Sequence, residues 1–282
     1  MYENLKRYKA KDVFKDKRIT TVASSWVYYF LLSLLPMVFL MVTAFNVFNV
    51  NLAEEVVFRL PEAFRPAGEV ILSTAENAGG GVTAFFIISI IFSGSTLFNQ
   101  MSKDGEYLYG ITGDRRAGIV RRFFSVTALC VLFLIFLLSA FLITFQKLIM
   151  QSFGVQDGQS RLFSSIGIGV VIFISYILIV LLNKFISPVK RSFFDLAIGS
   201  IVSLFIIVLG TIGFIFYLRI FKNLNAFYGS LVGVIVFLIW AYILMLGLVI
   251  GAAFNVKRYK NSLVREKRKS LAEKTPVSMA KV

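Results

Sequence analysis

The amino-acid sequence predicts an all-α integral membrane protein with six transmembrane helices and both termini in the cytoplasm. Three observations support this fold class: six long runs without charged residues, a hydrophobic fraction of 57%, and basic residues concentrated in alternate loops. Each run has about 20 or more residues, enough for a helix to cross a hydrocarbon core of roughly 30 Å. Backbone groups in lipid must be hydrogen-bonded within their own segment, so we expect the runs to be helices.

The six runs contain no Asp, Glu, Lys or Arg. In chain order they are Val22–Phe48, Val82–Ser102, Phe123–Phe145, Leu162–Asn183, Leu196–Leu218 and Asn223–Val256. A soluble domain of 282 residues could not bury six such segments. The sequence therefore predicts one membrane domain at 22–256, preceded by a basic segment at 1–21 and followed by a basic tail at 257–282.

Basic residues are distributed unequally over the loops. Residues 1–21, 103–122, 184–195 and 257–282 hold 24 of the 30 Lys and Arg residues, and the three other loops hold two each. Because cytoplasmic loops are enriched in Lys and Arg, both ends of the chain are predicted to be cytoplasmic. This topology, with attraction to anionic inner-leaflet lipids, explains the net charge of +15, so nucleic acid is not expected as a partner.

The loop at 49–81 is long enough to hold structure of its own outside the membrane. Apolar residues at helical spacing precede Pro61, and a second short apolar pattern precedes the glycines at 79–81. We therefore expect a short helical extracytoplasmic cap between the first two transmembrane helices. The basic tail from Lys257 is expected to continue the sixth helix before helical structure is lost.

Polar groups inside the first run lie on one helical face. Ser25, Tyr29 and Ser33 are one turn apart, and Pro36 removes a backbone donor and bends the helix. Such a helix could line a cavity that passes a polar group. The same hydroxyl groups could instead hold neighbouring helices together, and the sequence leaves both interpretations open.

The second run is the most polar of the six. Ser89, Ser93, Thr96 and Gln100 follow the spacing i, i+4, i+7, i+11, and the run then leads to Asp104 at the cytoplasmic surface. A row this polar should face protein or water rather than lipid. It predicts either the lining of a cavity or a seam of hydrogen bonds between helices.

Charged residues beside the runs are candidate contacts for lipid head groups. They are Asp104, Arg115, Arg116, Arg121 and Arg122 on the inside, and Arg219 and Lys222 on the outside. The two outer residues could equally be solvated anchors at the interface.

Glycines in the sixth run predict close helix packing. Gly229 and Gly233 are four residues apart, as are Gly247 and Gly251, so each pair lies on one helical face. The partner could be another helix of the same chain or a second copy in a homo-oligomer. Asn255, near the inner end, is expected to cap the helix or to bond a neighbouring one.

The sequence lacks the residues that several common kinds of catalytic site need. Histidine is absent and Cys130 is the only cysteine, so neither a His/Cys zinc site nor Ser-His-Asp or Cys-His catalysis can be built. No GxxxxGK[ST] phosphate-binding loop occurs. We therefore expect no catalytic residue, metal or cofactor, and a protein that is not an enzyme. The runs also lack a carboxylate at mid-membrane depth, which argues against ion coupling through a midplane acid.

Four stretches of the sequence, taken in their order and spacing, are informative about family. They are Tyr28–Pro36, Ser93–Tyr109, Tyr228–Leu231 with Trp240–Tyr242, and Gly247–Asn255. In their order and in their six-helix setting they resemble the YihY/BrkB family of bacterial inner-membrane proteins, over about residues 10–258.

The resemblance implies a multi-pass protein of the bacterial cytoplasmic (inner) membrane. Family members have been labelled ribonuclease BN, an activity that the missing histidines and metal ligands argue against here. Other members are associated with serum resistance or with envelope lipid handling and lipid export. We therefore expect a transporter or flippase of a lipid-like or amphiphilic envelope substrate. The alternatives are a non-transporting membrane scaffold for envelope assembly and a small-solute or ion channel.

Overall fold

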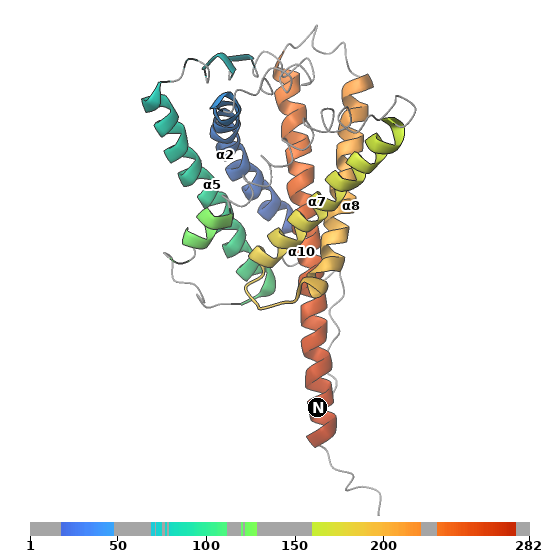
Figure 1. The fold of residues 1–282 in the computed structure, drawn as a ribbon. Coiled ribbons are helices and arrows are strands. Elements are labelled where there is room, and N and C mark those ends of the chain that lie inside the picture. The colour runs from blue at the N-terminus through green and yellow to red at the C-terminus, as the bar shows by residue number, and fades with distance from the viewer. Residues whose placement is uncertain are drawn as a thin grey trace, which may run out of the picture.

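The computed structural model describes residues 18–47, 69–70, 72–74, 77, 79–111, 120, 122–128, 160–220 and 230–274 of the chain. Within these ranges the regular structure is helical, without a strand (Figure 1). Five long helices carry most of it. They are α2 (Ile19–Val47), α5 (Gly80–Tyr109), α7 (Ser160–Ile186), α8 (Phe193–Ile220) and α10 (Ser230–Lys274).

Four of these helices contain segments that are long and apolar enough to cross a membrane. Among the described residues they are Ile19–Phe39, Gly80–Tyr109, Phe193–Tyr217 and Ile235–Leu271, and Val171–Ile186 of α7 is a shorter apolar helix. The chain is therefore a membrane protein, as its composition predicts, and the part of it that the structure describes is all-helical. The expected total of six spans is not established, because most of the third run, Phe123–Phe145, lies outside the described residues.

Two pairs of packed helices run in opposite directions, and their charged ends lie at the same end of the bundle. Trp26 near the start of α2 contacts Asp104 near the end of α5, so these two helices are antiparallel. Thr211 of α8 contacts Trp240 of α10, and Arg258 of α10 reaches the backbone of Asp195 at the start of α8, so these two are also antiparallel. The start of α2, the end of α5 and the polar part of α10 therefore lie at one end of the bundle (Figure 1).

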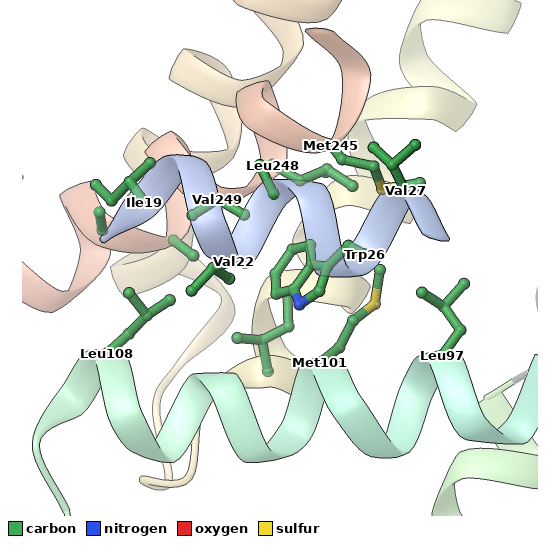
Figure 2. Close-up of a cluster of buried hydrophobic side chains, with 14 of the residues drawn as sticks. Ile19, Val22, Trp26, Val27, Leu97, Met101, Leu108, Met245, Leu248 and Val249 are labelled. Atoms are coloured by element: carbon green, nitrogen blue, oxygen red, sulfur yellow. The ribbon is translucent and has the colours of Figure 1, made fainter. Parts of the chain in front are cut away.

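The apolar core lies where α2 packs between α5 and α10. Figure 2 shows Trp26 of α2 pointing toward Met101 on α5, while Leu248 and Val249 of α10 lie on the other side of α2. Trp26 and Val249 have no exposed surface. Since lipid tails are as apolar as these side chains, close van der Waals packing rather than exclusion of water stabilises this contact.

Helix α5 continues to Tyr109, past the predicted boundary at Ser102. Its last turn is closed by Gly110, whose φ of 69° is the left-handed conformation that glycine adopts without strain. The Gly110 N–H donates to the Tyr107 carbonyl over 3.1 Å, and the Ile111 N–H donates to the Glu106 carbonyl over 3.1 Å. The extension places Asp104 inside a helix rather than in a loop.

Helix α10 has 45 residues and continues past Val256, the end of the predicted sixth run, as far as Lys274. At about 1.5 Å per residue it is about 67 Å long, roughly twice the hydrocarbon thickness. It extends beyond the other helices of the bundle (Figure 1). The predicted continuation of the sixth helix into the basic tail is therefore present.

The other predicted segments are described only in part. In the expected external cap, residues 69–70 and 72–74 are helical, in agreement with the second short helix predicted there. The first cap helix lies outside the described residues, as does nearly all of the basic segment at 1–21.

Candidate functional site

The predicted polar row of α5 lies between two different surfaces of the helix. Ser89, Ser93, Thr96 and Gln100 are half-buried. On one side of this row is the packed face of α5, formed by Ile90, Gly94, Leu97, Met101 and Leu108. On the other side are three exposed apolar side chains, Phe85, Ile88 and Phe92. The row therefore follows the boundary between the protein interior and the outer surface of the helix.

The hydroxyl groups of the row donate to their own helix. Ser93 Oγ donates to the Ser89 carbonyl over 2.7 Å, and Thr96 Oγ1 donates to the Phe92 carbonyl over 2.7 Å. Each hydroxyl oxygen keeps acceptor capacity after this bond. At about 1.5 Å per residue, the row from Ser89 to Asp104 is about 22 Å long, most of the thickness of a hydrocarbon core of roughly 30 Å.

The predicted polar face of α2 is more buried toward the middle of the helix. Ser25 and Tyr29 are half-buried, whereas Ser33 and Pro36 are buried. Ser33 Oγ donates to the Phe30 carbonyl of its own helix over 2.8 Å. The helix is continuous on both sides of Pro36. Helix α2 therefore offers the half-buried Ser25 and Tyr29 to a neighbouring polar group, and Ser33 bonds within the helix.

Asp104 joins the polar end of α5 to α2. Trp26 Nε1 donates to Asp104 Oδ2 over 2.7 Å, and Gln100 Nε2 donates to Asp104 Oδ1 over 3.0 Å. The sequence placed Asp104 at the membrane surface as a head-group contact, and it gave no role to Trp26. A buried indole N–H usually finds an acceptor, and this preference is the one signal that could have pointed to the pair.

A second buried polar cluster joins α7, α8 and α10. Asn255 Nδ2 of α10 donates to Asn183 Oδ1 of α7 over 3.4 Å, and Asn183 Nδ2 donates to Ser200 Oγ of α8 over 3.1 Å. Ser200 Oγ donates in turn to the Leu196 carbonyl over 3.0 Å. Asn255 thus bonds a neighbouring helix, one of the two roles expected for it. Ser200 lies near the start of the apolar run Leu196–Leu218, and no pattern in the sequence indicates its role.

Gly247 and Gly251 of α10 face α8 of the same chain. A Cβ atom on Gly251 would clash with Ser203 Oγ and with the carbonyl oxygen of Gly199, and one on Gly247 would lie 3.2 Å from side-chain atoms of α8. Gly233 lies in the first turns of α10, and Gly229 lies outside the described residues.

Of the predicted basic contacts, Arg122 is described best. Its guanidinium carbon lies 5.2 Å from the centre of the Phe92 ring, beside the polar row. Arg219 is in the last turn of α8. The others, Arg115, Arg116, Arg121 and Lys222, lie outside the described residues. Within the described part of the chain, no three His, Cys, Asp or Glu side chains gather as metal ligands would.

Comparisons with known proteins identify the family. The model of the family described as virulence factor BrkB matches residues 10–276. A relative from Bacillus subtilis (strain 168), YfkH, is 26% identical over 258 residues, which cover 88% of this chain and 90% of the relative. No solved structure matches this chain.

The name of the relative corrects one expectation. YfkH is named as a ribonuclease-like protein, which contradicts our prediction from residue types that the chain is not an enzyme. The absence of histidine excludes only the catalytic arrangements that need histidine. It does not exclude enzymatic activity of other kinds. The family itself is the one that the sequence motifs resemble. With a match over residues 10–276 and apolar helices able to span a bilayer, the chain is a membrane protein that belongs to the BrkB (YihY/BrkB) family.

Proposed function

We propose that this protein moves a lipid-like or amphiphilic envelope substrate across the bacterial cytoplasmic membrane, as a transporter or flippase. The proposal is carried by the polar row of α5, Ser89 to Asp104, which follows the boundary between the packed and the outer surface of the helix. Its length of about 22 Å is close to the distance that a head group must cross in the hydrocarbon core.

The surfaces on the two sides of the row suit the two parts of an amphiphile. The oxygens of Ser93 and Thr96 keep acceptor capacity for the donors of a head group. Phe85, Ile88 and Phe92 are 65%, 67% and 67% exposed, next to the row on its outer side. An acyl chain in contact with these side chains would stay in lipid while its head group followed the row.

The charged residues at the ends support the same substrate class. Arg122 beside Phe92, together with Arg115, Arg116 and Arg121, would attract anionic lipids of the inner leaflet, and Arg219 and Lys222 would do so at the outer face. The scaffold alternative would use the external cap and the glycine faces of α10, Gly247 and Gly251 among them, as contact surfaces. Since both glycines pack against α8 of the same chain, they do not favour it.

Lipid movement in reconstituted vesicles tests the proposal. The purified protein is placed in liposomes that contain fluorescent lipids with anionic or zwitterionic head groups, and the label in the outer leaflet is bleached with a reagent that does not cross the membrane. We expect the protein to expose inner-leaflet label that protein-free vesicles protect. A double variant, Ser93→Ala with Thr96→Val, removes both hydroxyls without adding bulk to the helix, and it should slow movement by about tenfold or more.

The control is Ile212→Val, on the exposed surface of α8 and outside the proposed pathway. It should leave the rate unchanged and fold like the parent protein by gel filtration. Protein that moves no label of any head group, although it is folded and inserted, would rule the proposal out.

RNA hydrolysis is a second candidate function, favoured by the name of the relative YfkH. The same purified sample, incubated with end-labelled RNA, tests it directly. Cleavage that co-elutes with the protein and exceeds that of an identical preparation from cells without the gene would support this activity. Intact RNA under conditions that support lipid movement would count against it.

A further inference from the structure

Asp104 is a carboxylate held inside the protein by uncharged groups. Its two oxygens accept from Trp26 of α2 and from Gln100 of α5, over 2.7 Å and 3.0 Å. Trp26 has no exposed surface, and Asp104 is half-buried. The carboxylate therefore lies at the end of the polar row. It also accepts a hydrogen bond that joins α2 to α5, the two helices that carry the predicted pathway.

The charged groups of the packed elements are directed elsewhere. Helix α2 contains no charged residue. Among the described residues, Lys103, the neighbour of Asp104 on α5, is the basic group whose charge interacts with the carboxylate. On α7, the Lys184 ammonium lies 3.8 Å from the centre of the Phe193 ring, and on α10 the Lys257 ammonium lies 5.4 Å from that of Phe254. Within the described residues, no Lys or Arg forms an ion pair with Asp104.

This environment selects the ligand that Asp104 can take. Both carboxylate oxygens already face N–H groups, whose positive ends would repel a metal cation approaching the same lone pairs. A proton needs no coordination shell and can bind to either oxygen. It also removes the charge from a position where no Lys or Arg of the described residues forms an ion pair with it.

We propose that Asp104 is a proton-binding residue that couples the contact between α2 and α5 to movement of the substrate, an inference that rests on the proposed transport function. A proton from hydronium binds to Oδ2, leaving water and a neutral carboxylic acid. Protonated Oδ2 becomes a donor, so the short bond from Trp26 Nε1 weakens and α2 can shift relative to the polar row. Loss of the proton restores the bond and the closed contact.

The tryptophan content provides a direct probe. The chain has two tryptophans, and in a Trp240→Phe background Trp26 is the only one left to report. Indole emission responds to a charge that appears or disappears beside the ring. In lipid nanodiscs, we expect the emission of this variant to follow one reversible proton titration between pH about 4 and about 9. Adding Asp104→Asn should abolish that titration, whereas Glu106→Gln, a carboxylate on the same turn, should leave it intact.

Two further measurements keep the proposal testable if the Asp104→Asn variant does not fold. If Asp104→Asn does not fold, Gln100→Ala removes one donor from the carboxylate and should shift the midpoint of the titration. A single-tryptophan parent whose emission does not change over the whole pH range would overturn the proposal without any Asp104 variant. A titration that persists in folded Asp104→Asn would also overturn the proposal.

Vesicle measurements distinguish this inference from the proposed function. Lipid movement that depends on pH in the parent and is independent of pH in Asp104→Asn supports both. Movement that is independent of pH in the parent supports transport and overturns the coupling. A Trp26 titration without movement of any lipid leaves the proton site but overturns transport and the coupling together.

Discussion

At the scale of single residues, the contact between α8 and α10, here called the seam, contains two pairs in which a glycine of one helix faces a polar side chain of the other. Ser203 of α8 lies against Gly251 of α10, and Asn255 of α10 lies against Gly199 of α8. Ser203 Oγ and Asn255 Oδ1 are buried without a hydrogen-bond partner in the described structure. The glycines let the two helices approach closely, and the resulting van der Waals contact stabilises the seam.

Gly251→Ala tests the seam. The added methyl group meets backbone as well as side-chain atoms of α8, so the two helices must separate, and we expect a loss of about 1–3 kcal/mol in stability. The measurement is thermal unfolding in detergent. Gly213→Ala on α8 is the matched control, because its Cβ would meet no atom within 4 Å. Equal melting temperatures for the two variants would show that the close approach does not contribute to stability.

Trp26→Phe tests the hydrogen bond to Asp104 by its effect on stability, without a pH titration. The variant keeps an aromatic ring but removes the donor to Oδ2 of a half-buried carboxylate, and we expect a loss of about 1–3 kcal/mol in stability. Trp240→Phe provides the comparison, because Trp240 donates over 3.3 Å to the neutral hydroxyl of Thr211. We expect the larger decrease in melting temperature for Trp26→Phe. The reverse order would contradict the importance assigned to the carboxylate.

These residue pairs could be predicted from sequence only in part. Gly247, Gly251 and Asn255 were selected as packing or bonding positions because spacing and residue type are local properties. Trp26 and Asp104 are 78 positions apart, and no local pattern indicates that they meet. The family resemblance, in contrast, could be read from ordered motifs and agrees with the family match.

At the scale of elements, α5 departs most clearly from its predicted limits. Hydropathy ended the segment at Ser102, because the charged residues that follow are typical of a loop. The helix persists to Tyr109, since its apolar residues Leu108 and Tyr109 are buried and Gly110 closes the last turn. Hydropathy thus located the part of the helix suited to lipid, and tertiary contacts determine where the helix ends.

Gly110→Ala tests the helix end. Alanine must adopt a left-handed conformation there, and we expect a loss of about 1–2 kcal/mol in stability. Gly110→Asn should have a smaller effect, because asparagine tolerates this conformation better. Thermal unfolding and hydrogen exchange of the amides in the last turn of α5 provide the measurement. An alanine variant as stable as the parent would mean that the end of α5 does not depend on this cap.

At the scale of the whole molecule, the arrangement agrees with the uneven distribution of charge. The start of α2, the ends of α5 and α7, and the basic part of α10 lie at one end of the bundle, where Asp195 accepts from Arg191 and Arg258. Alternation of helix direction could be predicted from alternating runs and loops. The choice of packing partners could not, because apolar runs of similar composition are interchangeable in lipid.

Cysteine labelling tests the orientation of this end. Replacing Cys130 by alanine removes the only cysteine, after which single cysteines are introduced at Gly79 and Ser270, both exposed. We expect a reagent that does not cross the membrane to label position 79 in intact cells and position 270 only after the inner membrane is opened. Labelling of both positions from the outside would contradict the predicted topology.

The length of α10 has a mechanical consequence. Between Ala252 and Lys274 the helix contains neither glycine nor proline, the residues at which helices most often bend. A partner that binds the basic end of α10 would therefore act on a continuous helix that leads directly to Gly247 and Gly251, where α10 meets α8.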